Sequence, residues 1–599
     1  MVETAGRFLH AAAIPYRVEV VANPSQDVLR ALSEKHVPHI YRSRYGNLDR
    51  ITRCKARMAG NTYIIAPMSE QGFYSSKVMP RAQADELIAR QRDYVERSGL
   101  LIQIDGYQGI GRKSPPVQWL YTPEGANVAG MQQVLAFPRS AVETEEQLAQ
   151  PFEPHFRLVM TPGCEASDCP CGVAILVDLE HWITYVLGSD YFGESKKGML
   201  RMLNEYVYQL GGLVLHAGAK AVTIGERRVS MAVMGLSGTG KTTTTFSHQG
   251  DRTEPIQDDM VCLWPDASCT PTENGCFAKT HGLEEDAEPV IYRGTIHPDA
   301  WVENVFLDPD GGYDFSKQQL TPAEVARWSA ALRASGATEE NLAAYIEGRV
   351  QAENLLDEHG VPRDGWDFVV WTQNGRSIIP MAAIENAAAL DHIPDIQSLG
   401  ILNRDEGPDA AMPGLLRFVS PDQAAAYFML GETSKTSAAG KERGKTRSPF
   451  TQPFFPRSPH LQARRFADLA AAMPHLQLWL MNTGFVGGEQ KDVARGTALK
   501  VKIGHSSAML EALLADGIVW KEDPDFGYEI VDVAASENAA LLERVPAEIL
   551  NPILFYDRHN RHAEYRAWVD RIKEARRQFL LKMGVEEKIL LQVHHYSGI

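Results

Sequence analysis

The stretch "MGLSGTGKTTTT", Met234 to Thr245, decides the fold of this 599-residue chain. Gly235, Gly240, Lys241 and Thr242 occupy the fixed positions of the pattern G-x-x-x-x-G-K-[ST], a loop whose backbone amides surround nucleotide phosphates. Such a loop joins a β-strand to an α-helix, so the stretch predicts an α/β domain that binds a mononucleotide. Many unrelated proteins carry this loop, and it therefore predicts a ligand but no particular reaction.

The composition is that of a globular protein with more than one domain: 599 residues, of which 44% are hydrophobic and 23% are charged. The net charge of -16 argues against a general nucleic-acid-binding surface, which needs clustered lysine and arginine. The sequence holds no apolar run of about 18 residues, so we expect no membrane span. The first residues lack the order of a secretory signal and cysteines are few, so we expect a cytoplasmic protein. The oligomeric state stays open, with a monomer among the alternatives.

Three cysteines lie close together in "CEASDCPCG", namely Cys164, Cys169 and Cys171. Thiolates at close spacing suit zinc or an iron–sulfur cluster. No paired C-x-x-C and no nearby histidine completes four ligands, so a surface loop with free thiols is the favoured interpretation.

Strand-like segments lead into the phosphate loop. Residues 211–238 hold three short β-rich runs separated by glycine-containing turns, the last of which enters the loop. Residues 100–109, "LLIQIDGYQG", predict a buried strand that ends in a turn, and residues 173–188 are also strand-like.

Three further segments have a different character. Residues 315–365 carry alanine, glutamate and leucine at helical spacing after the capping signature "TPAEV" at Thr321, and they predict a helical insertion. Residues 431–450 are polar and basic and predict a mobile surface loop. Residues 562–584 predict an amphipathic helix on the outside of the protein.

Acidic residues follow the phosphate loop. A nucleotide site needs a magnesium ligand, which the hydroxyl of Thr242 supplies, and usually a carboxylate at the end of a strand. Asp258 and Asp259 stand 17 and 18 residues after Lys241. Adjacent aspartates are also common in turns, but the loop upstream favours a metal site.

Two other polar stretches carry no strong signal by themselves. His216 lies in the apolar run "GLVLHAGAK", where a histidine usually belongs to the core. Lys196 and Lys197 lie beside glycines in "YFGESKKGMLRM", which by composition alone is a solvated turn.

The order of these motifs changes that interpretation. The succession "SDYFGESKKGM", "LH", "GLSGTGKTT" and "DD" resembles ATP-dependent phosphoenolpyruvate carboxykinase, a family with a Y-G-G-E-x-K-K-G-M segment. In that family a histidine follows nineteen residues after the second lysine, and here 216 − 197 = 19. The motifs "VENV", "GKERGKT" and "LMNTGF" continue the resemblance, which covers about residues 100–310 and 370–580.

The resemblance implies an α/β fold of two domains, with a P-loop mononucleotide-binding domain and mixed β-sheets. Residues 1–215 would form the N-terminal, substrate-side domain, of which residues 1–99 match the family poorly. Residues 216–599 would form the C-terminal nucleotide-binding domain, which carries the helical insertion.

The resemblance also implies roles for individual residues. Lys197, His216 and Asp259 look like the ligands of a transition metal, usually Mn²⁺, with Asp258 as the adjacent carboxylate, and Thr242 looks like the ligand of the Mg²⁺ on ATP. Tyr191 would pack against a small organic acid and Arg376 would pair with its carboxylate, while Lys196 would add positive charge. The residues expected around the nucleotide are Gly235, Leu236, Ser237, Gly238, Thr239, Gly240, Lys241, Thr242 and Arg443.

In the family, oxaloacetate loses CO₂ to leave an enolate, which takes the γ-phosphoryl group of ATP to give phosphoenolpyruvate and ADP. The metal, Lys241 and an arginine would stabilise the developing charge. The same scaffold could act as a kinase on a different small hydroxy acid or other acceptor. A non-catalytic nucleotide sensor is a third alternative, which the presence of all the metal-ligand positions disfavours.

The chain departs from the family on the organic-acid side. The family's G-R-S-P-K-D-K segment is missing, and "TRCKAR", with Arg53 and Arg57, is the nearest equivalent. Asp190 replaces the tryptophan before the site tyrosine and Phe192 replaces the glycine after it. A carboxylate beside a site for an anion is unfavourable unless it faces away or the substrate differs. The pattern predicts that the nucleotide-binding part of the site matches that of the family, while the part that binds the organic acid has changed.

Overall fold

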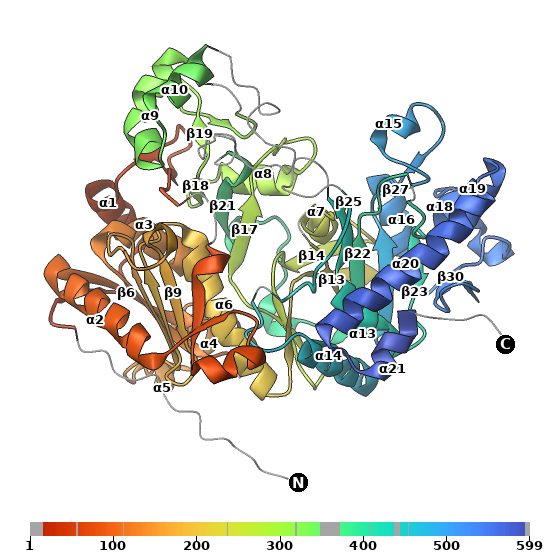
Figure 1. The fold of residues 1–599 in the computed structure, drawn as a ribbon, viewed down its shortest axis with the longest axis horizontal. Helices are drawn as coiled ribbons and strands as arrows, with labels where there is room; N and C mark the ends of the chain where they lie inside the picture. The colour runs from red at the N-terminus through yellow and green to blue at the C-terminus, as the bar shows by residue number, and fades with distance from the viewer. Residues whose placement is uncertain are drawn as a thin grey trace, which may run out of the picture. The chain divides into compact units, whose positions relative to one another are not determined.

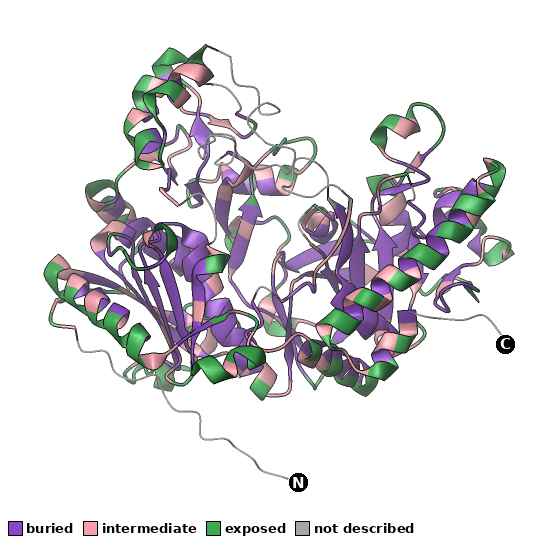
Figure 2. Cartoon of the chain, viewed as in Figure 1, coloured by how far each residue is buried: buried purple, intermediate pink, exposed green. Residues whose placement is uncertain are grey.

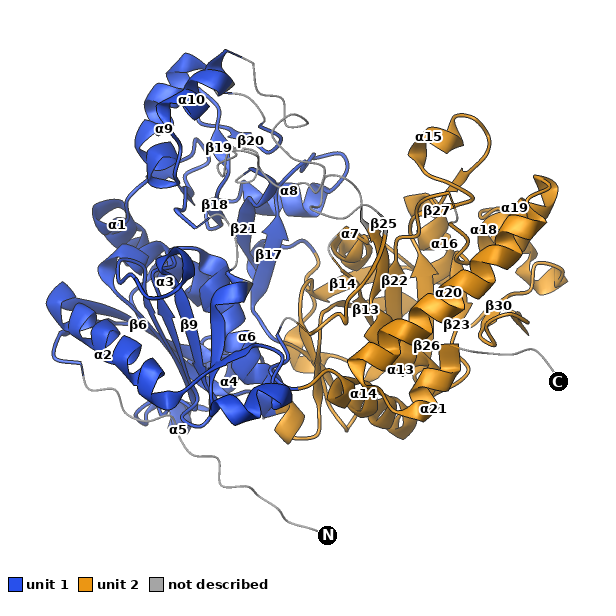
Figure 3. Cartoon of the chain, viewed as in Figure 1, with its two compact units in different colours: residues 1–206, 272–385, 453–457 blue, residues 207–271, 386–452, 458–599 orange. Residues whose placement is uncertain are grey.

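The computed structural model describes residues 16–54, 58–111, 113–236, 238–317, 320–347, 372–408, 410–435, 444–452 and 454–593. The chain forms two compact units (Figure 3). Unit 1 comprises residues 1–206, 272–385 and 453–457, and unit 2 comprises residues 207–271, 386–452 and 458–599. This division differs from the single boundary expected after residue 215, because the chain returns twice to unit 1.

Unit 1 is built on a mixed sheet of eight strands in the order β1-β6-β7-β8-β10-β9-β4-β5 (Figure 1). The strands are β1 (Glu19–Ala22), β4 (Thr62–Ile65), β5 (Lys77–Met79), β6 (Leu100–Tyr107), β7 (Pro116–Tyr121), β8 (Phe156–Thr161), β9 (Ala174–Asp178) and β10 (Ile183–Leu187). Helix α2 (Arg81–Ser98) packs on the face that carries Val159. Helix α6 (Phe192–Gln209) packs on the opposite face, where a side chain at Gly198 would meet Leu158. The sheet is thus covered on both faces.

A second sheet of unit 1 has the order β17-β21-β18-β3-β2. Its strands are β17 (Gly275–Lys279), β21 (Arg376–Pro380), β18 (Trp301–Glu303), β3 (Leu48–Arg50) and β2 (Ile40–Arg42). The expected helical insertion begins with α9 (Pro322–Ala334) and α10 (Glu339–Ile346). Trp328 of α9 is fully buried, with its ring centroid 4.2 Å from that of Tyr41 on β2. The described part of the insertion therefore supports this sheet.

Unit 2 contains an eight-stranded sheet in the order β14-β12-β13-β22-β26-β23-β30-β29. The strands are β12 (Ala217–Ile224), β13 (Arg227–Met234), β14 (Arg252–Gln257), β22 (Ile396–Asn403), β23 (Leu415–Arg417), β26 (Gln477–Asn482), β29 (Trp520–Glu522) and β30 (Glu529–Val531). The central strands β13, β22 and β26 are parallel. Ligands of α/β proteins bind at the carboxyl ends of such strands, and the phosphate loop follows β13 directly.

Helices cover both faces of this sheet. Helix α16 (Ile503–Leu514) packs on the face that carries Trp479. Helices α13 (Pro421–Leu430), α14 (His460–Ala472) and α20 (His562–Met583) pack on the face that carries Leu480. Figure 2 shows that α20 carries exposed residues along its length, interrupted by intermediate and buried ones. No helix in the described ranges is long and apolar enough to cross a membrane.

Several local predictions are confirmed. Strand β6 covers most of residues 100–109, and α20 coincides with the predicted amphipathic helix. Thr321 caps α9, with Glu324 as its reciprocal partner in a capping box. The expected loop at 431–450 is ordered at its two ends, where β24 (Glu432–Lys435) pairs with β25 (Gly444–Arg447). Residues 436–443 between them lie outside the described residues.

Candidate active site

The phosphate loop has the expected strand–loop–helix context, between β13 and the short helix α7 (Lys241–Phe246). Gly238 and Gly240 have φ angles of 87° and 90°, which side-chain-bearing residues rarely adopt. A Cβ at Gly235 would lie 2.4 Å from Thr239 Oγ1. The glycines are therefore required by the backbone of the loop. Ser237 lies outside the described residues.

Three of the predicted site residues meet within unit 2. His216 lies between β11 (Leu213–Leu215) and β12, and Asp259 follows β14. His216 Nε2 lies 3.0 Å and Lys241 Nζ lies 3.1 Å from the same oxygen, Asp259 Oδ1. Lys241 Nζ also donates to the backbone oxygen of Asp259 at 3.0 Å. The side chains are 10–18% exposed, so they are reachable from solvent without being surface groups.

This cluster fits a divalent metal ion. An imidazole nitrogen and a carboxylate oxygen are donors that Mn²⁺ and Mg²⁺ accept. They lie close enough together to contact one ion. Asp258 precedes Asp259 directly after β14, and its role as a metal ligand stays a prediction. Thr242, the predicted magnesium ligand, is half-buried in the first turn of α7.

A buried lysine contacts the chain that follows the phosphate loop. Lys220 of β12 is 1% exposed and donates to Thr244 O, Ser247 O and Gln249 Oε1, which are uncharged. Because burial disfavours the charged ammonium, the pKa of Lys220 is lowered to about 7. The side chain thus satisfies carbonyl groups at the end of α7.

Lys220 makes stability depend on pH. Between pH 7 and about 10.5 the unfolded lysine binds a proton that the folded one does not, so the free energy of unfolding rises with pH in this window. The slope from this group is at most about 1.4 kcal/mol per pH unit. Lys220→Met is expected to remove this slope in urea unfolding measured from pH 7 to 9.5. The exposed Lys500 provides the control, since Lys500→Met should keep the slope, and an unchanged slope in Lys220→Met would contradict the assignment.

The acid-side residues belong to unit 1. Tyr191 is buried, and a Cβ at Gly193 would lie 2.3 Å from its ring, so glycine is needed there. The backbone amide of Phe192 donates to Glu303 Oε1 at 2.9 Å, and the Phe192 ring packs edge-on against Phe277. Phe192 therefore fills a core position and ties the start of α6 to β18.

Asp190 is bound by residues at and directly after the end of β3. Its carboxylate accepts from Arg50 Nη2 at 3.1 Å and from the backbone amides of Arg53 and Cys54 at 2.7 and 2.9 Å. The Asp190 and Arg50 side chains are 9% and 4% exposed. The unfavourable charge noted in the sequence is thus neutralised by a buried ion pair, which also fixes the chain after β3.

Charged residues line one row of the five-stranded sheet. Lys279, Arg376, Glu303 and Arg50 are neighbours in register on β17, β21, β18 and β3, so their side chains project from the same face. Burial raises the pKa of Glu303 to about 8. Arg376 is half-buried, with its guanidinium 5.5 Å from the Phe277 ring centroid. The row is cationic overall and suits a small anion.

The two adjacent lysines differ in their surroundings. Lys196 is fully buried and forms an ion pair with Glu273, so its charge is balanced within unit 1. The ammonium of Lys197 lies 4.4 Å from the centroid of the Phe454 ring. The role of Lys197 as a metal ligand stays a prediction. Arg443 and Arg57 lie outside the described residues.

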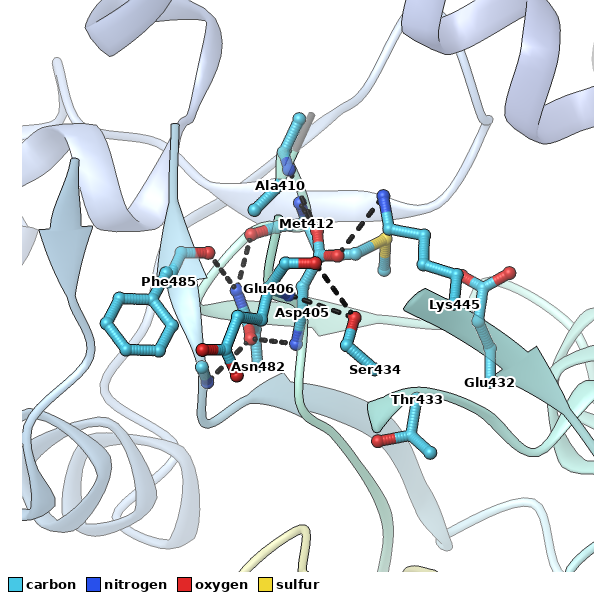
Figure 4. Close-up of polar contacts among 12 residues, drawn as sticks. Asp405, Glu406, Ala410, Met412, Glu432, Thr433, Ser434, Lys445, Asn482 and Phe485 are labelled. Carbon is cyan, nitrogen blue, oxygen red and sulfur yellow. Dashed lines mark hydrogen bonds and ion pairs between the residues drawn. The ribbon is translucent and has the colours of Figure 1, made fainter. Parts of the chain in front are cut away.

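A polar network holds the hairpin β24–β25 near the carboxyl end of β22 (Figure 4). Asp405 accepts from Lys445 Nζ at 3.2 Å and from the amides of Ala411 and Met412, and its own amide donates to Asn482. The hairpin is the part of the chain that flanks residues 436–443. Its base is therefore fixed to the strand ends that surround the phosphate loop.

The cysteine cluster shows no sign of a metal site. Burial raises the pKa of Cys164 and Cys169, which keeps both thiols protonated. Among the described residues the only histidine, cysteine or carboxylate group of three with metal-like spacing is Asp178, Glu180 and His181. Asp178 in that group is already paired with Arg81 at 2.5 and 3.0 Å.

The fold and the phosphate loop define an α/β nucleotide-binding protein, and comparison with known proteins gives its family. The sequence model described as phosphoenolpyruvate carboxykinase matches residues 19–343 and 335–538. The chain therefore belongs to the phosphoenolpyruvate carboxykinase family, in the branch of the ATP-dependent enzymes, as a divergent member.

Three relatives named phosphoenolpyruvate carboxykinase (ATP) illustrate the divergence. The protein of Parvibaculum lavamentivorans is 27% identical over 90% of this chain and 86% of its own length. That of Thermus thermophilus is 25% identical over 78% and 76%. That of Aeropyrum pernix is 31% identical over 61% and 63%. With several other relatives the match likewise spans 63–65% of their length.

The sequence motifs missed several residues that shape the site. Arg50 and Glu303 come together through pairing of strands some 250 residues apart, which leaves no local signal. Arg404 follows β22 and lines the cavity beside the phosphate loop. The position of a charged residue just after the apolar run of residues 399–402 is a signal that could have found Arg404.

Proposed function

We propose that this protein catalyses the ATP-dependent decarboxylation and phosphorylation of oxaloacetate to phosphoenolpyruvate, with release of CO₂ and ADP. The observation that carries the proposal is the contact of His216 and Lys241 with one oxygen of Asp259 beside the phosphate loop. A nucleotide switch would need the loop and a magnesium ligand, but not a histidine on that carboxylate. Family membership supports the same reaction.

The residues would divide the work as follows. The amides of the phosphate loop and Lys241 would hold the β- and γ-phosphates, and Thr242 would hold Mg²⁺. His216 and Asp259 would hold Mn²⁺, with Lys197 as the third ligand given by the resemblance. When bound, such an ion stabilises negative charge on an enolate oxygen. On unit 1, Arg376 would pair with a carboxylate of the acid and Tyr191 would pack against it.

The Asp190–Arg50 ion pair supports an anionic substrate. Because Arg50 and two backbone amides neutralise Asp190, the carboxylate that distinguishes this chain does not repel an acid bound near Tyr191. We infer a cytoplasmic enzyme with a nucleotide and a small organic acid as its substrates.

The test is a product assay. Purified protein with oxaloacetate, ATP, Mg²⁺ and Mn²⁺ is expected to form phosphoenolpyruvate and ADP in equal amounts, detected by ³¹P NMR. Chelation of the metals should stop the reaction and added metal should restore it. Binding of ATP without any phosphoenolpyruvate would refute the proposed reaction while leaving the nucleotide site intact.

One observation favours a second candidate, a kinase for an acid with a single carboxylate. Arg53, in the segment that replaces the family's G-R-S-P-K-D-K, pairs with Glu165 at 3.0 Å and donates to Gly188 O. Its guanidinium is therefore engaged within unit 1 and is not presented to a second carboxylate. ADP formation with another hydroxy acid, and none with oxaloacetate, would establish this alternative.

Arg376 gives a specific kinetic prediction. Arg376→Gln removes a charged hydrogen-bonding partner and is expected to raise KM for the acid about tenfold or more, with the Kd for ATP unchanged. The exposed Arg293 of unit 1 supplies the control, because Arg293→Gln should leave both constants unchanged. An unaltered KM in Arg376→Gln would exclude the proposed contact.

A further inference from the structure

Arg404 stands beside the phosphate loop, and no motif assigned it a role. It follows β22 directly and lines a cavity of about 150 Å³ together with Gly238, Thr239 and Gly240 of the loop. Hydroxyl-bearing residues of α7, of α16 and of the segments after α7 and β26 form the rest of its polar wall, namely Thr243, Thr244, Ser247, Thr483, Ser506 and Ser507. The cavity lies wholly within unit 2.

The Arg404 side chain is oriented from two sides. Its Nε donates to Glu406 Oε2 at 3.0 Å, and its guanidinium carbon lies 5.9 Å from the centroid of the Phe485 ring. Its backbone oxygen accepts from Ser434 of β24 at 2.7 Å. The amide of Asp405, the next residue, donates to Asn482 in the network described above. Arg404 is thus attached to a rigid strand end and not to a free loop.

The terminal nitrogens of Arg404 remain available for a ligand. Only Nε has an acceptor among the residues that the structure describes, so Nη1 and Nη2 offer their N–H groups to the cavity or to water. The side chain is 32% exposed. A planar guanidinium with a free edge matches the oxygens of a phosphate group, which it can bind in bidentate fashion.

We propose that Arg404 binds the polyphosphate of the nucleotide, as a second cation on the phosphate loop besides Lys241. Lys241 and Arg404 approach the loop with different partners, Asp259 for the lysine and Glu406 for the arginine. A simple solvated arginine would also be exposed, but it would not line the same cavity as three residues of a phosphate loop. The inference rests on the proposed nucleotide site and not on the identity of the acid.

The chain offers a matched control. Arg417 at the end of β23 donates from Nε to Glu529 at 2.6 Å, lies 4.9 Å from the centroid of the Trp520 ring and is 36% exposed. It reproduces the surroundings of Arg404 in the same sheet. Arg417 does not line the cavity at the phosphate loop.

The test measures binding to the full-length protein by calorimetry, with Mg²⁺ present and with ADP and inorganic tripolyphosphate as probes. Arg404→Gln is expected to weaken the binding of both probes about 10- to 100-fold. Arg404→Lys should give an intermediate loss of affinity, because lysine keeps the positive charge but lacks the planar guanidinium that binds in bidentate fashion. Arg417→Gln should bind both probes within about twofold of the wild type. Thermal unfolding of each variant checks that the fold is retained.

The outcomes separate this inference from the proposed reaction. If the wild type binds ADP, Lys241→Ala does not, and Arg404→Gln binds like the wild type, the inference is overturned and the nucleotide site stands. If Arg404→Gln weakens ADP but not tripolyphosphate, Arg404 contacts the nucleoside and the inference is also wrong. A wild type that binds neither probe contradicts the nucleotide site and the inference together.

Discussion

Replacement of Lys241 by alanine is expected to lower kcat for ATP-dependent turnover by about 100- to 1,000-fold. The ammonium of Lys241 supplies the positive charge that stabilises the phosphoryl group in transfer. It donates to both the backbone oxygen and the carboxylate of Asp259. The measurement is ADP release under saturating ATP, with the Kd for ATP determined separately.

Lys500→Ala provides the control for this experiment. Lys500 is an exposed lysine of unit 2 at the end of β28 (Leu499–Lys500), so its replacement should leave kcat unchanged. A Lys241→Ala protein with full activity would contradict the nucleotide site, whichever acid receives the phosphate.

Arg576→Ala is expected to destabilise the protein by about 3–5 kcal/mol, because it leaves a buried carboxylate without its main partner. Arg576 of α20 is fully buried and its Nη2 lies 2.7 Å from Glu432 Oε1 at the start of β24. Its Nη1 donates to the hydroxyl of Tyr427 at 3.1 Å. Arg447 then remains as the second cation on Glu432. Urea unfolding followed by circular dichroism measures the loss.

The neighbouring Arg577 is a suitable control, since its side chain is 39% exposed and its replacement should change stability by less than about 0.5 kcal/mol.

The ion pair between Arg576 and Glu432 also predicts that the stability of the protein is sensitive to acid. Arg576 and Arg447 lower the pKa of Glu432 from 4.5 to about 2. A carboxyl with a depressed pKa contributes stability that is present above its unfolded value and lost as pH falls toward its folded value. Arg576→Ala should therefore flatten the stability curve between pH 4.5 and pH 2, and an unchanged curve would contradict the pairing.

Local patterns predicted the elements whose causes are local. The φ angles of Gly238 and Gly240 and the capping box at Thr321 each depend on a few adjacent residues, and the motif rules apply to them directly. Helix α20 was predictable for a similar reason. Its buried positions, from Tyr565 to Leu580, follow the helical period.

Other features depend on pairing between distant segments. Asp190 looked unfavourable in the sequence because its partner Arg50 stands 140 residues earlier in the chain. The two ends of the expected loop at 431–450 pair as β24 and β25, and Glu432 of β24 also contacts Arg576 on the last long helix. Neither pairing leaves a periodic or compositional trace, so pattern reasoning could not find it.

The return of the chain to unit 1 has a consequence for biosynthesis. Strand β3 pairs along one edge with β2, which is only a few residues away in the sequence. Along its other edge it pairs with β18, where Leu48 lies opposite Trp301. At about 5–20 residues per second, a ribosome needs roughly 10–50 s to make the intervening stretch. During that time the edge of β3 that later pairs with β18 is unpaired. The row of charged residues that contains Arg376 cannot form until β18 and β21 have been made. A fragment that ends at residue 215 would lack β18 and would keep that edge of β3 unpaired.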